Sequence, residues 1–338
     1  MEESTQTRRS RAWLVKAVGV VIAVYAVVIL ALMWWWDYEP PHFDVTTTAQ
    51  ARVGAKTQKL VTGSVTVSTL MSCAETLLNK RGGYLSNDKF PPGVLMDNVP
   101  NWEFGVLVAT RDLSDAMRNE FSRSQTQSTE DRDLKEAAPL FNSPNDRWLL
   151  PASERQYRKA IGYMDSYLTR LADNDQSDAQ FFARADNLSD YLATVSTRLG
   201  SLSQRLSASV GQERLDTDLA GDPNAQQSTP TTSPRVVKTP WLQIDDNFYE
   251  ARGYTWALRE QLEAIRVDFG PVLRDKNAMV SLEQVIRELH ESQNPVGSPI
   301  ILNGTPFGFF ANHSLVMANY ISRANAAVID LRELLRRG

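Results

Sequence analysis

The sequence predicts an all-α protein, in which one N-terminal transmembrane helix precedes an elongated helical bundle on the periplasmic side of the membrane. Three observations predict this class. An uncharged apolar run lies near the N-terminus, apolar residues recur at steps of three and four along most of the chain, and no series of alternating apolar and polar residues indicates a sheet. The repeat is close to seven residues, which is typical of left-handed, heptad-like packing at shallow crossing angles.

Composition and charge exclude two classes of function or structure. The chain has 338 residues, of which 42% are hydrophobic and 22% charged, as in an ordinary globular protein. Its 36 basic and 40 acidic side chains leave no basic surplus, which argues against nucleic acid as a partner. Cys73 is the only cysteine, so an intrachain disulfide is excluded, and its apolar neighbours favour a small buried side chain over a nucleophile.

The apolar run AVGVVIAVYAVVILALMWWW predicts a transmembrane anchor over residues 17–36, after a short cytoplasmic tail of residues 1–16. The run contains 20 residues without a charge, about the number that spans the hydrocarbon core of a bilayer. The following stretch, MWWWDYEPP, offers no small-x-small cleavage site, so we expect the anchor to stay uncleaved. The lipid bilayer is therefore the first predicted partner.

The charges on either side of the anchor predict its orientation in the inner membrane. Four basic residues precede it, whereas Asp37 and Glu39 follow it, so we expect the N-terminus in the cytoplasm and the C-terminal domain in the periplasm. Gly19 and Ala23 form a small-x-x-x-small pair, which leaves a homo-oligomer open, although such spacing also arises by chance. Aromatic rings favour the headgroup region and supply interface anchors at both ends of the run: Trp13, Trp34, Trp35, Trp36 and Tyr38.

The remaining chain is predicted to form one helical domain in two parts. Residues 37–56 contain adjacent prolines and no apolar period, so we interpret them as an extended juxtamembrane spacer. Residues 57–206 form the first part of the domain. Residues 207–240 are rich in Ser, Thr, Pro and Gln and are expected to be a flexible linker. Residues 241–338 return to helical spacing as the second part.

Four helices are expected in the first part of the domain. Gly82-Gly83 ends the first, because glycine tolerates the left-handed cap conformation, and the second begins around Asn101. S-x-x-Q capping boxes at Ser153 and Ser177 begin the third and fourth, which we expect to run antiparallel. The apolar spacing of the four covers Leu60–Leu77, Phe104–Phe121, Tyr157–Leu171 and Phe181–Leu206.

Three more helices are expected after the linker. Their apolar spacing covers Phe248–Phe269, Met279–Leu289 and Met317–Leu335. The first of them is the expected partner of the Phe181–Leu206 helix. An intermolecular coiled coil is the alternative use of this stripe, but Ala185 and Thr255 are weak at a dimer seam, so we favour packing within one chain.

No motif in the sequence predicts a catalytic residue, a cofactor or a metal. There is no G-x-S-x-G elbow, no phosphate-binding G-x-x-x-x-G-K-[ST], no G-x-G-x-x-G and no C-x-x-C. The histidines at positions 42, 290 and 313 are too scattered for a zinc site. Asp245 and Asp246 are a carboxylate pair, and an exposed helix start explains them equally well.

Two Pro/Gly-rich regions contain the candidate interaction residues. The first combines polar groups with an aromatic ring, as binding sites often do, in Asp97, Asn98, Asn101, Trp102 and Glu103. The second either buries its rings or offers an apolar patch to a partner or the bilayer, through Phe307, Phe309 and Phe310, with His313 nearby. The structural alternative for the first region makes Asn101 a helix N-cap and places Trp102 at the top of the bundle.

Two stretches carry a resemblance to a known family. YLSNDKFPPGVLMDNVPNWEFGVLVATRD and RWLLPASERQYRKA, together with the N-terminal anchor, resemble an uncharacterised bacterial inner-membrane family, the domain of unknown function 2333 family. The resemblance covers nearly the whole chain. It implies a protein of the Gram-negative envelope, and it brings no known reaction, ligand or catalytic residue.

Two functions are compatible with these observations. The first is a non-enzymatic, membrane-anchored scaffold or adaptor of the cell envelope that binds an envelope protein. It is favoured by the single anchor, the helical bundle and the lack of catalytic motifs. The alternative is a periplasmic enzyme or ligand-binding protein that acts on cell-wall or lipid material, with a cleft between the regions of Trp102 and Phe309.

Overall fold

A computed structural model of the chain confirms the all-α class. It describes residues 2–54, 60–123, 129–173, 178–214, 235–298 and 300–337, with the backbone alone for 2–12, 212–214, 235 and 236. The α-helices are α1 (Glu2–Trp36), α2 (Val45–Gly54), α3 (Ser64–Asn79), α4 (Asn98–Ala116), α5 (Arg132–Phe141), α6 (Ser153–Ala172), α7 (Ala185–Ser207), α8 (Ile244–Asp268), α9 (Gly270–Asp275), α10 (Met279–Glu291) and α11 (His313–Arg336). The shorter elements are the 3-10 helices η1 (Gly93–Leu95), η3 (Ala208–Val210) and η4 (Trp241–Gln243), the π-helical turn η2 (Met117–Phe121), and the antiparallel strands β1 (Gln212–Arg214) and β2 (Arg235–Val237).

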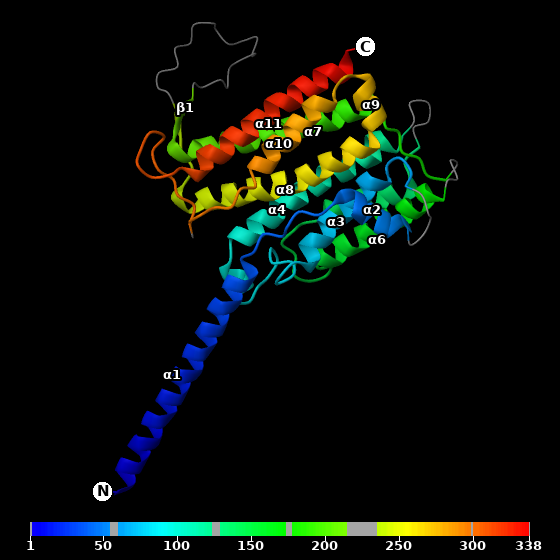
Figure 1. Cartoon of the computed structure of the whole chain (residues 1–338). Coiled ribbons are helices and arrows are strands. Elements are labelled where there is room, and N and C mark those ends of the chain that lie inside the picture. Colours follow the sequence, from blue (N-terminus) through cyan, green and yellow to red (C-terminus); the bar gives the residue numbers. More distant parts are fainter. Residues whose placement is uncertain are drawn as a thin grey trace, which may run out of the picture.

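The bundle has three layers of helices, and α1 projects away from it (Figure 1). One outer layer contains α7, α10 and α11, the middle layer contains α4 and α8, and the other outer layer contains α2, α3 and α6, with α5 packed on α6. One large hydrophobic core joins the layers, and a small second cluster packs α2 on α3 and α8. From Trp13 to Trp36, α1 is long and apolar enough to cross a membrane, and almost all of its side chains there are exposed.

Two glycines allow the middle layer to form. α4 and α8 run in the same direction and lie against each other along most of their length. A Cβ on Gly253 would lie 1.9 Å from the backbone oxygen of Trp102. A Cβ on Gly105 would lie 2.0 Å from that of Glu250. The close approach of these two helices therefore requires residues without side chains at both positions.

The apolar stripe predicted over Phe181–Leu206 is buried from Leu188 onward, but its helix starts later than expected. α7 begins at Ala185, and residues 178–184 have no helical structure. Phe182 N donates to Phe121 O at 2.6 Å, so this stretch is held by the end of the α4–η2 helix. Ser177, in the predicted capping box, lies outside the described residues.

α7 has a different main partner from the predicted one. It lies antiparallel along α11, where Ser196 Oγ donates to Asn325 Oδ1 at 2.8 Å and Arg336 Nε donates to Ser189 Oγ at 3.2 Å. It touches α8 as well, whereas α6 packs mainly on α3 and α5. α6 and α7 do run in opposite directions, as expected, but they pack mainly on other helices, because apolar spacing shows which face of a helix is buried but does not show which helix covers it.

The segment interpreted as an extended spacer contains a helix. α2 buries Val45, Ala49 and Val53 against α3 and α8. The carboxylate of Asp44 accepts a hydrogen bond from Thr47 N at 2.5 Å, which caps the first turn. The sequence does not indicate this helix, because its three buried apolar residues make a period too short to stand out beside the preceding prolines.

Other helices begin at residues that differ from the predictions. α3 begins at Ser64, after residues 55–59, which are not described. Asp97, and not Asn101, is the N-cap of α4. Ser153 is the first residue of α6, and its hydroxyl donates to Pro144 O at 2.7 Å, so the predicted capping box does not form.

Only the two ends of the predicted linker 207–240 are described. The end of α7 leads into η3 and β1, and the chain returns through β2, which pairs with β1. Thr239 N donates to Ala208 O at 3.0 Å, which brings the two ends together. The predicted flexibility concerns mainly residues 215–234, which lie outside the described residues.

Candidate functional site

The residues that follow α1, 37–42, are held against the bundle, and we name them the junction segment. Arg252 of α8 donates from Nε to the Glu39 carboxylate at 2.7 Å. Its Nη1 donates to Asn294 O at 2.9 Å and to Ser292 O at 3.3 Å. The Arg252 side chain is 6% exposed, so its charge depends on these partners. One guanidinium therefore joins the junction segment, α8 and the C-terminal end of α10.

Two further contacts hold the junction segment. Trp256 Nε1 donates to Pro40 O at 3.1 Å. The Glu260 carboxylate is 1% exposed and accepts from His42 Nδ1 at 2.5 Å and from Arg259 Nη1 at 2.7 Å. The His42 ring also stacks on Trp256, with the ring centroids 5.9 Å apart. These contacts make the segment a part of the bundle, where the sequence predicted a free spacer.

The last turn of α1 also touches the bundle. The Arg81 guanidinium lies 4.4 Å from the centroid of the Trp35 ring and 3.9 Å from that of Tyr38. Gly82 has a φ of 80°, and a Cβ on it would lie 2.7 Å from the Trp36 ring. These three predicted interface anchors therefore pack on the loop that follows α3. Trp35 and Tyr38 keep about half of their surface exposed, and Trp13 and Trp34 are more exposed still.

A cavity of about 650 Å³ lies between the junction segment and the bundle. Trp102 and Trp256 form part of its wall, with their ring centroids 5.3 Å apart. Trp102 Nε1 is buried and has no hydrogen-bond partner among the described residues. Burial, and then the nearby Glu39 carboxylate, raise the pKa of Asp37, which also lines the cavity. The cavity is thus lined by aromatic rings and charged groups.

The first predicted interaction region lies at the N-terminal end of α4. Asp97 caps this helix and Asn98 is its first residue, and both line a smaller cavity of about 160 Å³. Asn101 Nδ2 donates to Asp246 Oδ1 at 2.6 Å, which ties α4 to the first turn of α8. Trp102 is buried against α8 and lines the larger cavity. The structure therefore divides these residues between helix capping and the cavity wall.

Glu103 has a structural role inside the bundle. Its carboxylate lies 2.5 Å from Lys80 Nζ, and both side chains are buried. It also accepts from the backbone N–H groups of Leu85 and Ser86, each at 2.8 Å. Burial raises the pKa of Glu103 despite the opposing effect of the Lys80 charge. This carboxylate shapes the loop after α3 and does not reach the cavity.

The second predicted interaction region does expose its rings. Phe307 and Phe309 are fully exposed and Phe310 is largely exposed, so the alternative in which they bury themselves is wrong. His313 begins α11 and accepts from Leu302 N at 3.1 Å on its Nδ1. Burial lowers the pKa of this histidine. None of these four residues lines the cavity beside Trp102, although Pro295, Val296 and Ser298 of the same Pro/Gly-rich region do.

The residues that build the junction were not singled out from the sequence. Arg252 and Glu260 belong to no motif in the sequence, and His42 is one of three histidines too scattered for a zinc site. One pattern could have indicated Arg252: it lies four residues after Phe248 and three before Thr255, on the apolar face of its helix. A charge at such a position requires a buried partner.

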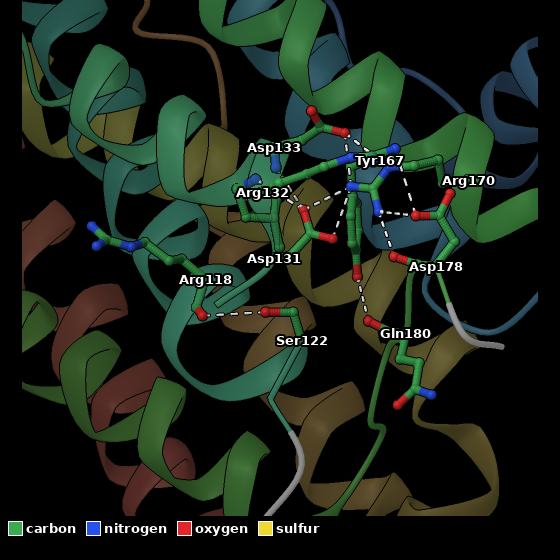
Figure 2. Close-up of polar contacts among 10 residues, drawn as sticks. Arg118, Ser122, Asp131, Arg132, Asp133, Tyr167, Arg170, Asp178 and Gln180 are labelled. Carbon is green, nitrogen blue, oxygen red and sulfur yellow. Dashed lines mark hydrogen bonds and ion pairs between the residues drawn. The ribbon is translucent and has the colours of Figure 1, made fainter. Parts of the chain in front are cut away.

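Figure 2 shows a second buried charge cluster, centred on Arg170 near the C-terminal end of α6. Its Nη2 lies 2.8 Å from both carboxylate oxygens of Asp131 and 2.7 Å from Asp133 Oδ2. Its Nη1 donates to Asp178 O at 2.5 Å, and its Nε donates to Asp133 at 3.0 Å. This cluster joins α5, α6 and the stretch before α7. Every nitrogen of the Arg170 guanidinium is bonded within the protein, so this side chain has no nitrogen without a partner to offer a ligand.

Within the described parts of the chain, no group of three or more His, Cys, Asp or Glu side chains is placed to hold a metal ion.

Fold and site together define an all-α protein whose apolar N-terminal helix is held against a helical bundle through the junction segment. The chain belongs to the DUF2333 family, described as an uncharacterized protein conserved in bacteria, whose model matches residues 7–338. The predicted resemblance is thereby confirmed. No curated protein and no solved structure matches the chain.

Proposed function

We propose that the protein is a membrane-anchored scaffold of the bacterial cell envelope, which holds its helical bundle in one orientation on the membrane. One observation carries this proposal: the end of α1 and the junction segment are fastened to the bundle by Arg81, Arg252, Trp256 and Glu260. A flexible tether would need none of these contacts. A fixed joint instead sets the orientation of the bundle relative to the membrane helix.

The same contacts support an anchor that is retained. Removal of α1 after Trp36 would strip the Trp35 and Trp36 rings from Arg81 and Gly82 and expose the surface that they cover. The basic residues before the apolar run support a cytoplasmic N-terminus, an inner-membrane location and a periplasmic bundle. The open space around Gly19 is compatible with close packing of two anchors.

The exposed phenylalanines support an adaptor role toward an envelope protein. Phe307, Phe309 and Phe310 lie on a loop whose ends are joined by hydrogen bonds from Gly304 N to Ala311 O at 3.0 Å and from Asn312 Nδ2 to Gly304 O at 2.6 Å. An ordered loop loses little conformational entropy when it binds. An apolar pocket on another protein is the occupant that such rings suit.

The scaffold proposal is tested by the distance between α1 and the bundle. Spin labels on Trp34→Cys and Val280→Cys, both exposed sites, report this distance by pulsed electron paramagnetic resonance in nanodiscs. We expect one narrow distance distribution, which broadens in Arg252→Ala. Glu333→Ala is the matched control, because it removes only a surface ion pair with Arg337. An equally broad distribution in all three proteins would overturn the proposal.

The adaptor role is tested separately in intact cells. A photo-crosslinking amino acid at Phe309 is expected to capture one defined envelope protein, whereas the same group at the exposed Val280 captures none. Capture of lipid alone at Phe309 would show that the loop meets the bilayer and would overturn this role.

The unused donor of Trp102 favours a second candidate function, which is ligand binding in the larger cavity. Nε1 is covered by protein atoms, so an envelope lipid or cell-wall fragment with an oxygen acceptor would satisfy it once the cavity wall beside Trp102 opens. Trp102→Phe retains the aromatic ring and removes the donor. If the cavity binds such a ligand, mass spectrometry of the purified protein finds it with the wild-type chain and at a lower level with Trp102→Phe. Equal amounts, or none, would rule out this function.

A further inference from the structure

Two loops beside the end of α1 expose an apolar patch that neither the fold nor the junction uses. The loops are residues 80–97, after α3, and residues 142–152, after α5. The patch, which we name the loop patch, consists of Phe90, Val94, Leu95, Trp148, Leu149 and Leu150. Leu150 is 89% exposed and Phe90 66%. Such a concentration of exposed apolar side chains marks a surface that is covered in the working protein.

The two loops form one ordered unit. Tyr84 Oη donates to Asn145 O at 3.0 Å, and Asn87 Nδ2 donates to Arg147 O at 2.8 Å. The Phe90 and Trp148 rings meet edge to face, with centroids 5.8 Å apart. The patch is therefore presented in a fixed shape.

Leu150 adds a sign of functional constraint. Its φ of 55° lies in the left-handed region, which is unfavourable for a residue with a branched side chain. The chain accepts this conformation at a leucine that buries almost nothing in the bundle. A strained backbone conformation at a residue that does not pack in the core is typical of a residue that contacts a partner outside the protein.

The position of the loop patch identifies what covers it. The first loop starts at Arg81 and Gly82, which contact the rings of Trp35, Trp36 and Tyr38 at the end of α1. Figure 1 shows these loops next to the point where α1 leaves the bundle. If α1 crosses a bilayer, its terminal tryptophans lie at the level of the headgroups. The loop patch then lies at the same level.

The charges around the loop patch suit an anionic membrane surface. The two loops and the first turns of α6 expose these basic side chains: Arg81, Lys89, Arg147, Arg155, Arg158 and Lys159. Acidic side chains on the same stretches are fewer: Asp88, Asp97, Asp146 and Glu154. Exposed basic residues next to inserted apolar rings are the usual composition of a surface that binds negatively charged lipids.

We propose that the loop patch inserts into the interfacial region of the bilayer that α1 crosses, with Lys89 and Arg147 on anionic headgroups. The bundle then contacts the membrane at α1 and at the loop patch, and this second contact fixes its tilt. The proposal rests on the proposed function, because it requires α1 to be retained in the membrane.

The test places a spin label at three positions of the full chain in nanodiscs that contain phosphatidylglycerol. Leu150→Cys reports on the loop patch, Val280→Cys is an exposed control on α10, and Val24→Cys reports on α1. Cys73 is fully buried, so the unsubstituted chain should take up no label. Accessibility to oxygen, which partitions into lipid, is compared with accessibility to a water-soluble nickel complex.

We expect oxygen to exceed the nickel complex at Leu150→Cys and Val24→Cys, and the reverse at Val280→Cys. Lys89→Glu with Arg147→Glu should shift the Leu150→Cys label toward water in phosphatidylglycerol nanodiscs, and shift it less in pure phosphatidylcholine. A water-exposed label at Leu150→Cys together with a lipid-exposed one at Val24→Cys would overturn this inference alone. Water exposure at Val24→Cys would overturn the anchored scaffold itself.

Discussion

Glu39 and Arg252 lie 213 positions apart in the sequence and form an ion pair that joins the exit of α1 to the middle of α8. The pair is asymmetric, because the arginine side chain is buried whereas the Glu39 side chain is one-third exposed. Arg252 also holds the carbonyls of Ser292 and Asn294, just after α10, so its removal affects three parts of the chain at once. This makes the pair the most direct place to test the joint between anchor and bundle.

Arg252→Ala is expected to lower the free energy of unfolding by roughly 3 kcal/mol, because it leaves the α10 carbonyls and a partly buried carboxylate without their donor. Arg252→Lys should lose less than the alanine variant, since it retains the charge but lacks the planar fork. Urea unfolding of the full chain in detergent measures both. A loss for Arg252→Ala below about 0.5 kcal/mol, as for a surface pair, would contradict this assignment.

Asp268 predicts a dependence of stability on pH. Its carboxylate at the end of α8 accepts from Thr66 N and Thr66 Oγ1, each at 2.7 Å, and burial raises its pKa from 3.8 to about 6. Between these values the folded chain retains a proton that the unfolded chain has released. This group therefore contributes roughly 3 kcal/mol to the free energy of unfolding below about pH 4, and the contribution is lost as pH rises to about 6.

Asp268→Asn removes this titration. The free energy of unfolding of the wild type minus that of the variant should therefore fall as pH rises through this window and stay constant above it. Urea unfolding of both proteins at several pH values measures the difference. A difference that is flat or grows with pH would show that the aspartate is charged in the folded state throughout.

Most helices could be predicted because their apolar residues recur with the helical period. α7 and α8 illustrate this, because the predicted apolar positions from Leu188 to Leu206 and from Phe248 to Phe269 are buried. The spacing did not indicate that α8, in the middle layer, is buried on nearly all sides. Helix ends were less accurate, because Ser153 has the residue type of an N-cap but uses its hydroxyl on a distant carbonyl. Which helices pair was not predictable either, since α4 and α8 depend on the fit between Gly253 and the Trp102 backbone.

The junction could not be derived from local patterns. Arg252 and Glu260 find their partners, Glu39 and His42, more than 200 positions away in the chain, and no periodicity encodes such pairs. The sequence singles out Phe307 and Phe309 as unusual, but the loop conformation decides whether their rings are buried or exposed. Apolar composition alone leaves both outcomes open.

Gly253→Ala is expected to lower the free energy of unfolding by about 1–3 kcal/mol, because the new methyl group would meet the backbone of α4 at 1.9 Å and force α4 and α8 apart. Gly162→Ala is the matched control in the middle of α6, where a Cβ meets no atom within 4 Å. That substitution should raise stability by roughly 0.5–1 kcal/mol through helix propensity. Thermal unfolding of both variants distinguishes packing from propensity, and equal effects would show that α4 and α8 tolerate separation.

Arg170→Ala tests the cluster of Figure 2. It leaves Asp131 and Asp133 buried without a cation, so we expect a loss of about 3 kcal/mol or more in the free energy of unfolding. The loss should be local at first, with faster hydrogen exchange in α5 and in residues 178–184, because Arg170 is what joins them to α6. Arg184→Ala removes a partly exposed pair with Asp186 and a hydrogen bond to Asn187 at the start of α7, so as the control it should leave exchange in α5 unchanged. Similar exchange in both variants would mean that the packing of Leu134, Phe141 and Tyr167 alone holds this end of the bundle, and that the charge cluster only fills space created by that packing.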